Sequence, residues 1–205
     1  HVSMRLGACH AYLGNIDRAK VLLNEALEIA LEHRLPRTTD ILNRLCFVGI
    51  RSGDIQAAFE HARASGLMAE AQGNTLGVAN SYAMMSRTRW QAGDLAAAEF
   101  FLEEATIRFE RFGSRQGLAE AANTRGELAR TRGDLEAAEN AYIEACARYR
   151  SIGSNSGMFP QLNLGMTYLL AAKFSQARAT LDMVETAFEK GDRKAALLVI
   201  RLAKT

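Results

Sequence analysis

The sequence predicts an all-α fold, a right-handed α-solenoid of about five antiparallel helix hairpins plus one terminal helix. Its 205 residues include 35 Ala and only 2 Pro, and Ala has the highest helix propensity whereas Pro interrupts helices. Similar short turn segments recur along the chain at a nearly constant interval, which is typical of repeat proteins. Apolar residues between the turns follow helical spacing rather than strict alternation, so we expect no strands.

Five turn segments share one pattern, in which an apolar residue lies two positions after the first residue and an alanine lies five positions after it. Their first residues are Gly14, Gly53, Gly93, Gly133 and Ala172. A further glycine lies about one helix length after each of the last four turns, at Gly73, Gly113, Gly153 and Gly191. Glycine commonly ends a helix in the left-handed conformation. Glycines spaced in this way therefore predict two helices per repeat.

The repeat divides the chain into helix pairs within one superhelical domain. The predicted units are residues 1–34, 35–73, 74–113, 114–153 and 154–191, followed by a partial unit at 192–205. Asp54, Asp94 and Asp134 directly follow a turn glycine, and each is expected to cap the next helix by accepting from its free N–H groups. The chain starts with His rather than Met, and residues 195–202 are apolar almost all round. We therefore expect a fragment of a longer protein.

Small residues occupy fixed positions on both sides of the turns. Gly7, Gly126 and Gly165 each lie seven residues before a turn, and an alanine lies five residues after the start of each turn. We expect these small residues to face one another, because this would let the two backbones approach closely. The second repeat departs from the pattern, since Cys46 replaces the glycine and Ser65 replaces a later alanine.

This order of glycine, turn, alanine and a large residue four positions later resembles the tetratricopeptide repeat. The fourth unit gives the fullest match, with Gly126, Gly133, Ala138, Tyr142 and Ala145. The resemblance covers nearly the whole chain. The period of about 40 residues exceeds the family's usual period of about 34, and it resembles longer-armed variants such as those of kinesin light chain and of bacterial regulators and signalling kinases.

The resemblance implies that the first helix of each pair lines an inner surface. It also implies that this surface is a groove for a peptide or a partner segment, so that the chain is a protein-interaction scaffold. The alternative is a ligand-sensing or oligomerisation arm of a larger bacterial transcription regulator or signalling kinase. Self-association through the apolar residues 195–202 is a further expectation.

Charge is distributed unevenly between the predicted helices, although the net charge is only +2. Three prospective first helices, at residues 36–52, 76–92 and 115–132, each carry a net charge of +2. Three prospective second helices, at residues 54–72, 94–111 and 134–150, carry −2, −3 and −2. A basic inner surface would attract an acidic peptide. Alternatively, the opposite charges pair between neighbouring helices.

Asparagines on the prospective first helices suggest a second means of holding a peptide. A side-chain amide offers both a donor and an acceptor to a peptide backbone, unless it faces solvent or bonds locally. Trp and Arg are common anchors of interfaces, although Trp90 is equally consistent with core packing. Met166 lies on an uncharged segment that is either a binding surface or core. The predicted peptide-binding residues are Asn43, Arg51, Asn80, Arg87, Trp90, Asn123, Glu127, Arg130, Asn163 and Met166.

The sequence contains no pattern typical of a catalytic or cofactor site. It has no phosphate-binding loop, nucleophile elbow or HExxH motif, and Cys9, Cys46 and Cys146 form no metal-binding cluster. We therefore expect no catalytic residue, cofactor or metal, and no enzyme. The near-neutral charge gives no basis for direct nucleic-acid binding. No apolar stretch is long enough to span a membrane, and we expect a cytoplasmic location.

Overall fold

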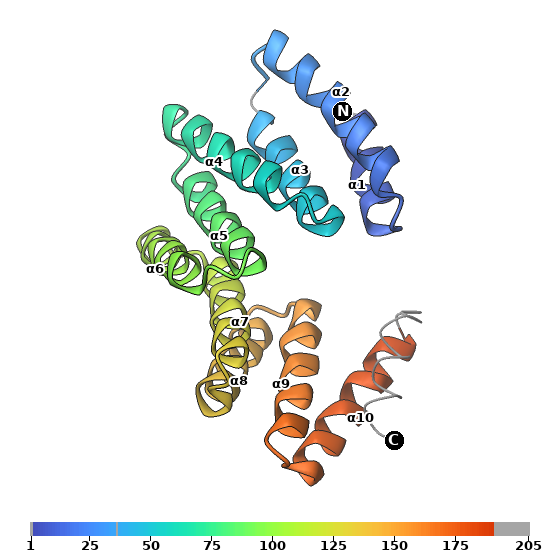
Figure 1. The fold of residues 1–205 in the computed structure, drawn as a ribbon, viewed down its shortest axis with the longest axis vertical. Coiled ribbons are helices and arrows are strands. Elements are labelled where there is room, and N and C mark those ends of the chain that lie inside the picture. The colour runs from blue at the N-terminus through green and yellow to red at the C-terminus, as the bar shows by residue number, and fades with distance from the viewer. Residues whose placement is uncertain (1, 36, 191–205) are drawn as a thin grey trace. The chain divides into compact units, whose positions relative to one another are not determined.

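The computed structural model describes residues 2–35 and 37–190. In this part of the chain it contains ten α-helices, one short 3-10 helix and no strand, which confirms the all-α prediction. The helices are α1 (Val2–Tyr12), α2 (Ile16–Glu32), α3 (Thr38–Ser52), α4 (Ile55–Ala71), α5 (Thr75–Gln91), α6 (Leu95–Phe112), α7 (Arg115–Thr131), α8 (Leu135–Ser151), η1 (Asn155–Gly157), α9 (Met158–Leu170) and α10 (Phe174–Lys190). Successive α-helices form antiparallel pairs joined by short turns (Figure 1).

Contacts between helices divide the chain into two compact units, residues 1–114 and 115–205. In the first unit α1 pairs with α2, α3 with α4 and α5 with α6, while α2 packs on α3 and α4 packs on α5. In the second unit α7 pairs with α8, α9 pairs with α10, and α8 packs on α9. We call the leading member of each pair its first helix and the other its second helix. The first helices touch one another within each unit, α3 with α1 and α5, and α7 with α9. Each unit therefore presents a surface of adjacent first helices, its first-helix face.

A residue in the left-handed conformation ends the first helix of every described pair. Gly53, for example, has a φ of 78°, which glycine adopts without a steric penalty. The fifth turn has no glycine, and Ala172 takes its place with a φ of 55°. Directly after three of the turns, the predicted caps form, and Asp54, Asp94 and Asp134 each accept a hydrogen bond from the backbone N–H three residues later.

Glycines of the first helices make room for large side chains of the second helices. The expected approach to the turn alanine is found at Gly7, where a Cβ would lie 3.4 Å from the backbone oxygen of Ala19, but in each pair the nearest atoms belong to the large residue. The contacts are Gly7 with Leu23, Gly126 with Tyr142 and Gly165 with Leu181. A Cβ atom built on Gly126 would lie 2.6 Å from the ring of Tyr142, which is fully buried. In each pair the large residue lies four positions after the turn alanine, one helical turn further along the same face. A close-packed interior leaves no space for both that residue and a Cβ opposite it.

The second pair achieves similar packing with a different distribution of side-chain size. Cys46 stands where the first, fourth and fifth repeats have glycine, and Ala62 stands where the other repeats have a large residue. Both side chains are fully buried in one apolar cluster. A glycine occurs one turn later, at Gly49, where an added Cβ would lie 2.9 Å from the Cβ of Ala58. The predicted glycine–alanine contact thus exists here, at a position that the repeat pattern did not indicate.

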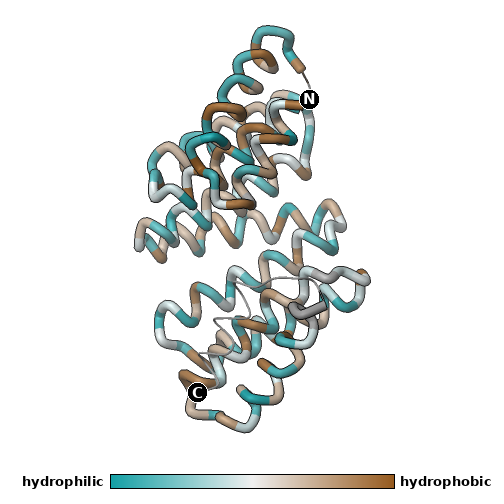
Figure 2. The backbone as a smooth tube through the Cα atoms, turned by 90° about the vertical axis from the view of Figure 1, so that its right-hand side faces the viewer, coloured by the Kyte–Doolittle hydropathy of each residue, from teal (hydrophilic) through white to brown (hydrophobic). Residues whose placement is uncertain are grey.

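Hydrophobic and hydrophilic residues interleave along the described helices (Figure 2). Among the described residues, no helix is both long enough and apolar enough to cross a membrane. The predicted turn at Gly191, the terminal helix at 192–205 and the apolar segment 195–202 lie outside the described residues.

Replacing Ala172 by glycine should stabilise the second unit, because glycine relieves the positive φ of 55°. We expect the free energy of unfolding, measured by urea denaturation, to rise by about 0.5–1 kcal/mol after the larger backbone entropy of unfolded glycine is subtracted. The matched control is Gly133→Ala at the equivalent turn, where φ is 83° but an added Cβ meets no atom within 4 Å. This control should lower the urea midpoint. A midpoint that falls in Ala172→Gly would contradict the explanation.

Substituting Gly126 by alanine should destabilise the second unit by about 1–3 kcal/mol, because the new methyl group overlaps the Tyr142 ring. Tyr142→Ala removes that ring and is destabilising in its own right. The double variant should be more stable than the sum of the two single effects predicts, by about 0.5–3 kcal/mol in a double-mutant cycle. Strict additivity would show that the two residues do not share the packing contact described above.

Candidate functional site

The first-helix face of the first unit contains a hollow of about 320 Å³. It is lined by Ala8, Ala11, Asp40, Asn43, Arg44, Phe47 and Met84, which come from α1, α3 and α5. The contacts of α3 with both neighbouring first helices bring these side chains together. Small alanines on α1 and the larger residues of α3 give the hollow an apolar floor with polar groups beside it.

Asn43 is the sequence-predicted residue that lines this hollow. Its side chain is half-buried, and its Oδ1 atom is buried without a hydrogen-bond donor. A buried acceptor without a donor costs free energy, and most such atoms in proteins are satisfied. Within the described residues, Asp40 and Arg44 on the same helix form no ion pair. The hollow is therefore lined by the half-buried amide of Asn43 and by two opposite charges without an ion pair in the described part of the chain.

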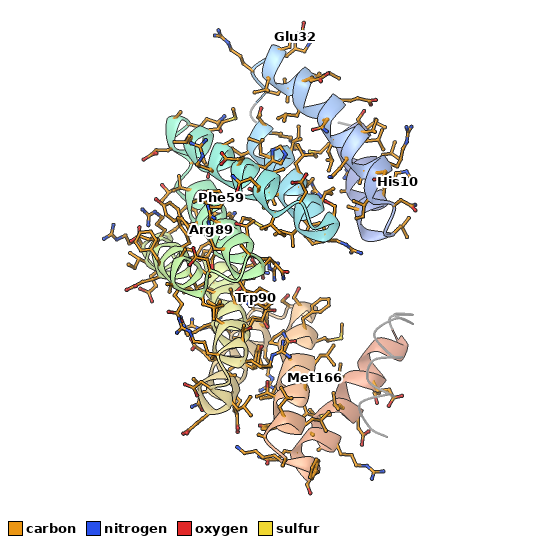
Figure 3. The ribbon with its side chains drawn as sticks, in the orientation of Figure 1. His10, Glu32, Phe59, Arg89, Trp90 and Met166 are labelled. Atoms are coloured by element: carbon orange, nitrogen blue, oxygen red, sulfur yellow. The ribbon has the colours of Figure 1, made fainter. Side chains whose placement is uncertain are left out.

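The other predicted residues of the first unit lie on α3 and α5. Arg51 is exposed, with its guanidinium carbon 5.9 Å from the centre of the Phe47 ring. Arg87 lies close enough to Cys46 to oppose the effect of burial, which raises the pKa of that thiol to about 12. Asn80 and Trp90 are half-buried on α5, and Figure 3 labels Trp90 near the end of that helix. The structure thus groups Asn43 with Arg51 around Phe47.

Several basic side chains of the first helices are engaged by neighbouring helices. The Arg89 guanidinium lies over the Phe59 ring of α4, 3.7 Å from its centre (Figure 3). Arg125 of α7 forms a salt bridge of 3.2 Å with Glu144 of α8. Some of the basic side chains on first helices and acidic side chains on second helices therefore take part in contacts between neighbouring helices.

In the second unit, three predicted residues form one hydrogen-bonded network. Asn123 Nδ2 donates to Glu127 Oε1 at 3.1 Å on the same helix, α7. Asn163 Nδ2, on α9, donates to Asn123 Oδ1 at 3.3 Å and to Glu127 Oε1 at 3.5 Å. Glu127 is buried, with 9% of its surface exposed. These bonds connect the two first helices of the second unit through polar side chains.

Arg130 and Met166 lie on the same helices as this network. Both are half-buried, Arg130 on α7 and Met166 on α9, where Figure 3 labels it. Burial raises the pKa of the neighbouring Tyr142 to about 12, and Arg130 acts in the opposite direction. The described contacts therefore join two subsets of the predicted residues, Asn43 with Arg51 around Phe47 in the first unit, and Asn123, Glu127 and Asn163 in the second.

Sequence reasoning missed Asp40, Arg44, Phe47 and Met84, which line the hollow of the first unit. A usable signal was present in the repeat, because Phe47, Arg87 and Glu127 occupy equivalent positions in successive repeats. Every first helix therefore presents the same positions to this face, whatever residue fills them.

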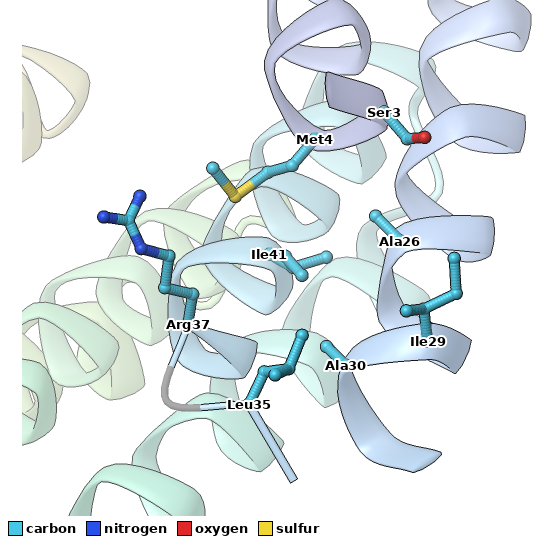
Figure 4. A pocket seen from close by; sticks show the side chains of 8 residues that line it. All are labelled: Ser3, Met4, Ala26, Ile29, Ala30, Leu35, Arg37 and Ile41. Carbon is cyan, nitrogen blue, oxygen red and sulfur yellow. The ribbon is translucent and has the colours of Figure 1, made fainter. Parts of the chain in front are cut away.

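A second hollow, of about 280 Å³, lies between α1, α2 and α3 and has a mostly apolar lining (Figure 4). Arg37 is the charged residue among those that line it. Within α3, Thr38 and Thr39 are buried, and α1 contributes Ser3 and Met4 to the hollow. This hollow contains none of the predicted site residues. No group of three or more His, Cys, Asp or Glu side chains that could hold a metal occurs among the described residues.

Comparisons with known proteins give one family match and several solved structures of similar fold. A family model described as tetratricopeptide repeat matches residues 1–33, which contain α1 and α2. No curated protein matches the sequence. Among solved structures, the Rap conjugation gene regulator of the plasmid pLS20, in complex with the Phr* peptide, has a TM-score of 0.88 at 12% identity, covering 97% of this chain and 56% of that one.

Two further structures show the same fold. The putative kinesin light chain TPR-like repeats of Podosopora anserina have a TM-score of 0.64 at 15% identity, covering 94% of this chain and 95% of that one. BtubC (BKLC) from P. vanneervenii has a TM-score of 0.67 at 22% identity, covering 92% and 79%. The tetratricopeptide-repeat model thus matches the first helix pair, and these solved structures share the fold along nearly the whole length of the chain.

Proposed function

We propose that this chain is a protein-interaction scaffold that binds an extended peptide segment on its first-helix face. The observation that carries this proposal is the hollow of the first unit, in which the buried Oδ1 of Asn43 has no donor. An extended peptide presents an N–H group at every residue except proline, so it can supply the missing donor whatever its sequence.

The fold supports the same role at a coarser level. The Rap regulator, whose structure matches 97% of the present chain, was solved in complex with a peptide. Repeat arrays of this kind commonly use surfaces built from equivalent positions of successive repeats to bind extended partners. Two pairs of equivalent positions line the hollow described here, Ala8 with Phe47 and Arg44 with Met84.

We further propose that the peptide carries an acidic residue near α3. Arg44 lines the hollow and has no ion pair within the described residues, and Arg51 is exposed beside Phe47. In contrast to Arg125, these two guanidinium groups are not occupied by a carboxylate of a neighbouring helix. A carboxylate on the peptide would pair with them, while Asp40 would disfavour a second carboxylate at the other side of Asn43.

A screen of immobilised short peptides of varied sequence tests the proposal. We expect the chain to select peptides enriched in Asp and Glu, and we expect Asn43→Ala to weaken the selected peptide by about 1 kcal/mol, or roughly fivefold, because one hydrogen bond is lost. The melting temperature of Asn43→Ala should not fall, since the variant removes a buried acceptor that has no donor in the free protein.

The matched control is Asn24→Ala, an exposed asparagine on the second helix α2 of the same unit, which should leave affinity unchanged. Failure to select any peptide would overturn the proposed function. Selection without an excess of acidic residues would overturn only the charge preference, and unchanged affinity in Asn43→Ala would remove Asn43 from the site.

A further inference from the structure

We infer that Glu127 is a positioning residue, which fixes the amide groups of Asn123 and Asn163 so that the first-helix face of the second unit recognises the N–H groups of a peptide. This inference deepens the proposed function and rests on it for the identity of the ligand. It concerns α7 and α9 alone.

The orientation of both asparagines follows from the chemistry of a carboxylate. An ionised carboxylate oxygen only accepts hydrogen bonds, so the Asn123 side-chain atom 3.1 Å from Glu127 Oε1 must be the nitrogen. The same argument applies to the Asn163 atom 3.5 Å from that oxygen. Amide orientation is otherwise ambiguous. Here one buried carboxylate determines it for two residues on two helices.

With both amide nitrogens turned toward Glu127, the oxygens are left to interact with other groups. Asn123 Oδ1 accepts from Asn163 Nδ2 at 3.3 Å. Asn163 Oδ1 has no donor within the described residues, and the Asn163 side chain is half-buried. Asn163 therefore offers an acceptor with which an N–H group can pair, whereas a carbonyl or a carboxylate has no hydrogen to donate to it.

The first unit provides an internal comparison at the equivalent positions. Asn43 corresponds to Asn123 and Phe47 corresponds to Glu127, each two repeats earlier in the chain. Position 47 has no carboxylate, and within the described residues no side chain bonds to the amide of Asn43, whose buried Oδ1 has no donor. The first-helix faces of the two units thus differ in whether a carboxylate bonds to the asparagine amide. Glu127 provides that carboxylate in the second unit.

Hydrogen exchange of the side-chain amides, followed by NMR on the full chain without ligand, tests the orientation directly. Hydrogen bonds to a charged acceptor are about twice as strong as neutral ones, so we expect Glu127→Gln to speed exchange at both Asn123 and Asn163 by about tenfold. The matched control, Glu120→Gln, changes an exposed carboxylate on the same helix that accepts from Gln116 Nε2 at 2.8 Å. It should leave both asparagines unchanged. Equal exchange rates in Glu127→Gln and the unmodified chain would overturn the inference.

Backbone N-methylation of a peptide selected in the screen tests the recognition. Each N-methyl group removes one N–H donor. We expect one position at which methylation weakens binding to the unmodified chain by about tenfold, and this sensitivity should be lost in both Glu127→Gln and Asn163→Ala. A scan with the same sensitive position in all three proteins would overturn the inference even though a peptide binds. If no peptide binds, the proposed function fails, and the amide-exchange result alone decides whether Glu127 orients the asparagines.

Discussion

Close contact between the two helices of each pair is the constraint on which the rest of the structure depends. Where a glycine of the first helix lies against a leucine or tyrosine of the second, as at Gly126 and Tyr142, the large side chain is buried between them. Packing of this kind occupies one side of the first helix and leaves another side to meet the neighbouring first helices. The candidate binding faces consist of that remaining side, so their existence follows from the packing of the pairs.

Most of the fold could be predicted because it depends on local sequence patterns, and each pattern occurs several times along the chain. Turn glycines need a positive φ, and aspartates after them cap helices, and both signals act within a few residues of chain. The contact partner of a glycine is not local in this sense. Gly126 meets Tyr142 rather than Ala138, and this choice depends on how two helices are rotated against each other, which sequence spacing does not specify. For the same reason, sequence spacing does not show that Cys46 and Ala62 pack in one cluster, with the larger of the two side chains on the first helix instead of the second.

The site was predictable in position but not in chemistry. Nine of the ten residues singled out from the sequence, all except Arg51, belong to the hollow of the first unit or to equivalent positions of other first helices. The sequence could not show that Asn123, Glu127 and Asn163 bond to one another, because this depends on contact between α7 and α9. Nor could it show which arginines are occupied by neighbouring helices, as Arg125 is by Glu144. Opposite charges on adjacent helices are consistent with a surface that attracts a charged ligand and also with ion pairs between the helices. Only the distances between the charged groups distinguish these two possibilities.

The claim that peptides bind to first helices is tested most directly by backbone hydrogen–deuterium exchange of the full chain with and without a selected peptide. Peptide binding should slow exchange in first helices, above all in α3 around Asn43 and in α7 and α9 around Glu127, and it should leave α4 and α6 nearly unchanged. Protection confined to the second helices would contradict the account, because those helices take no part in the faces described here.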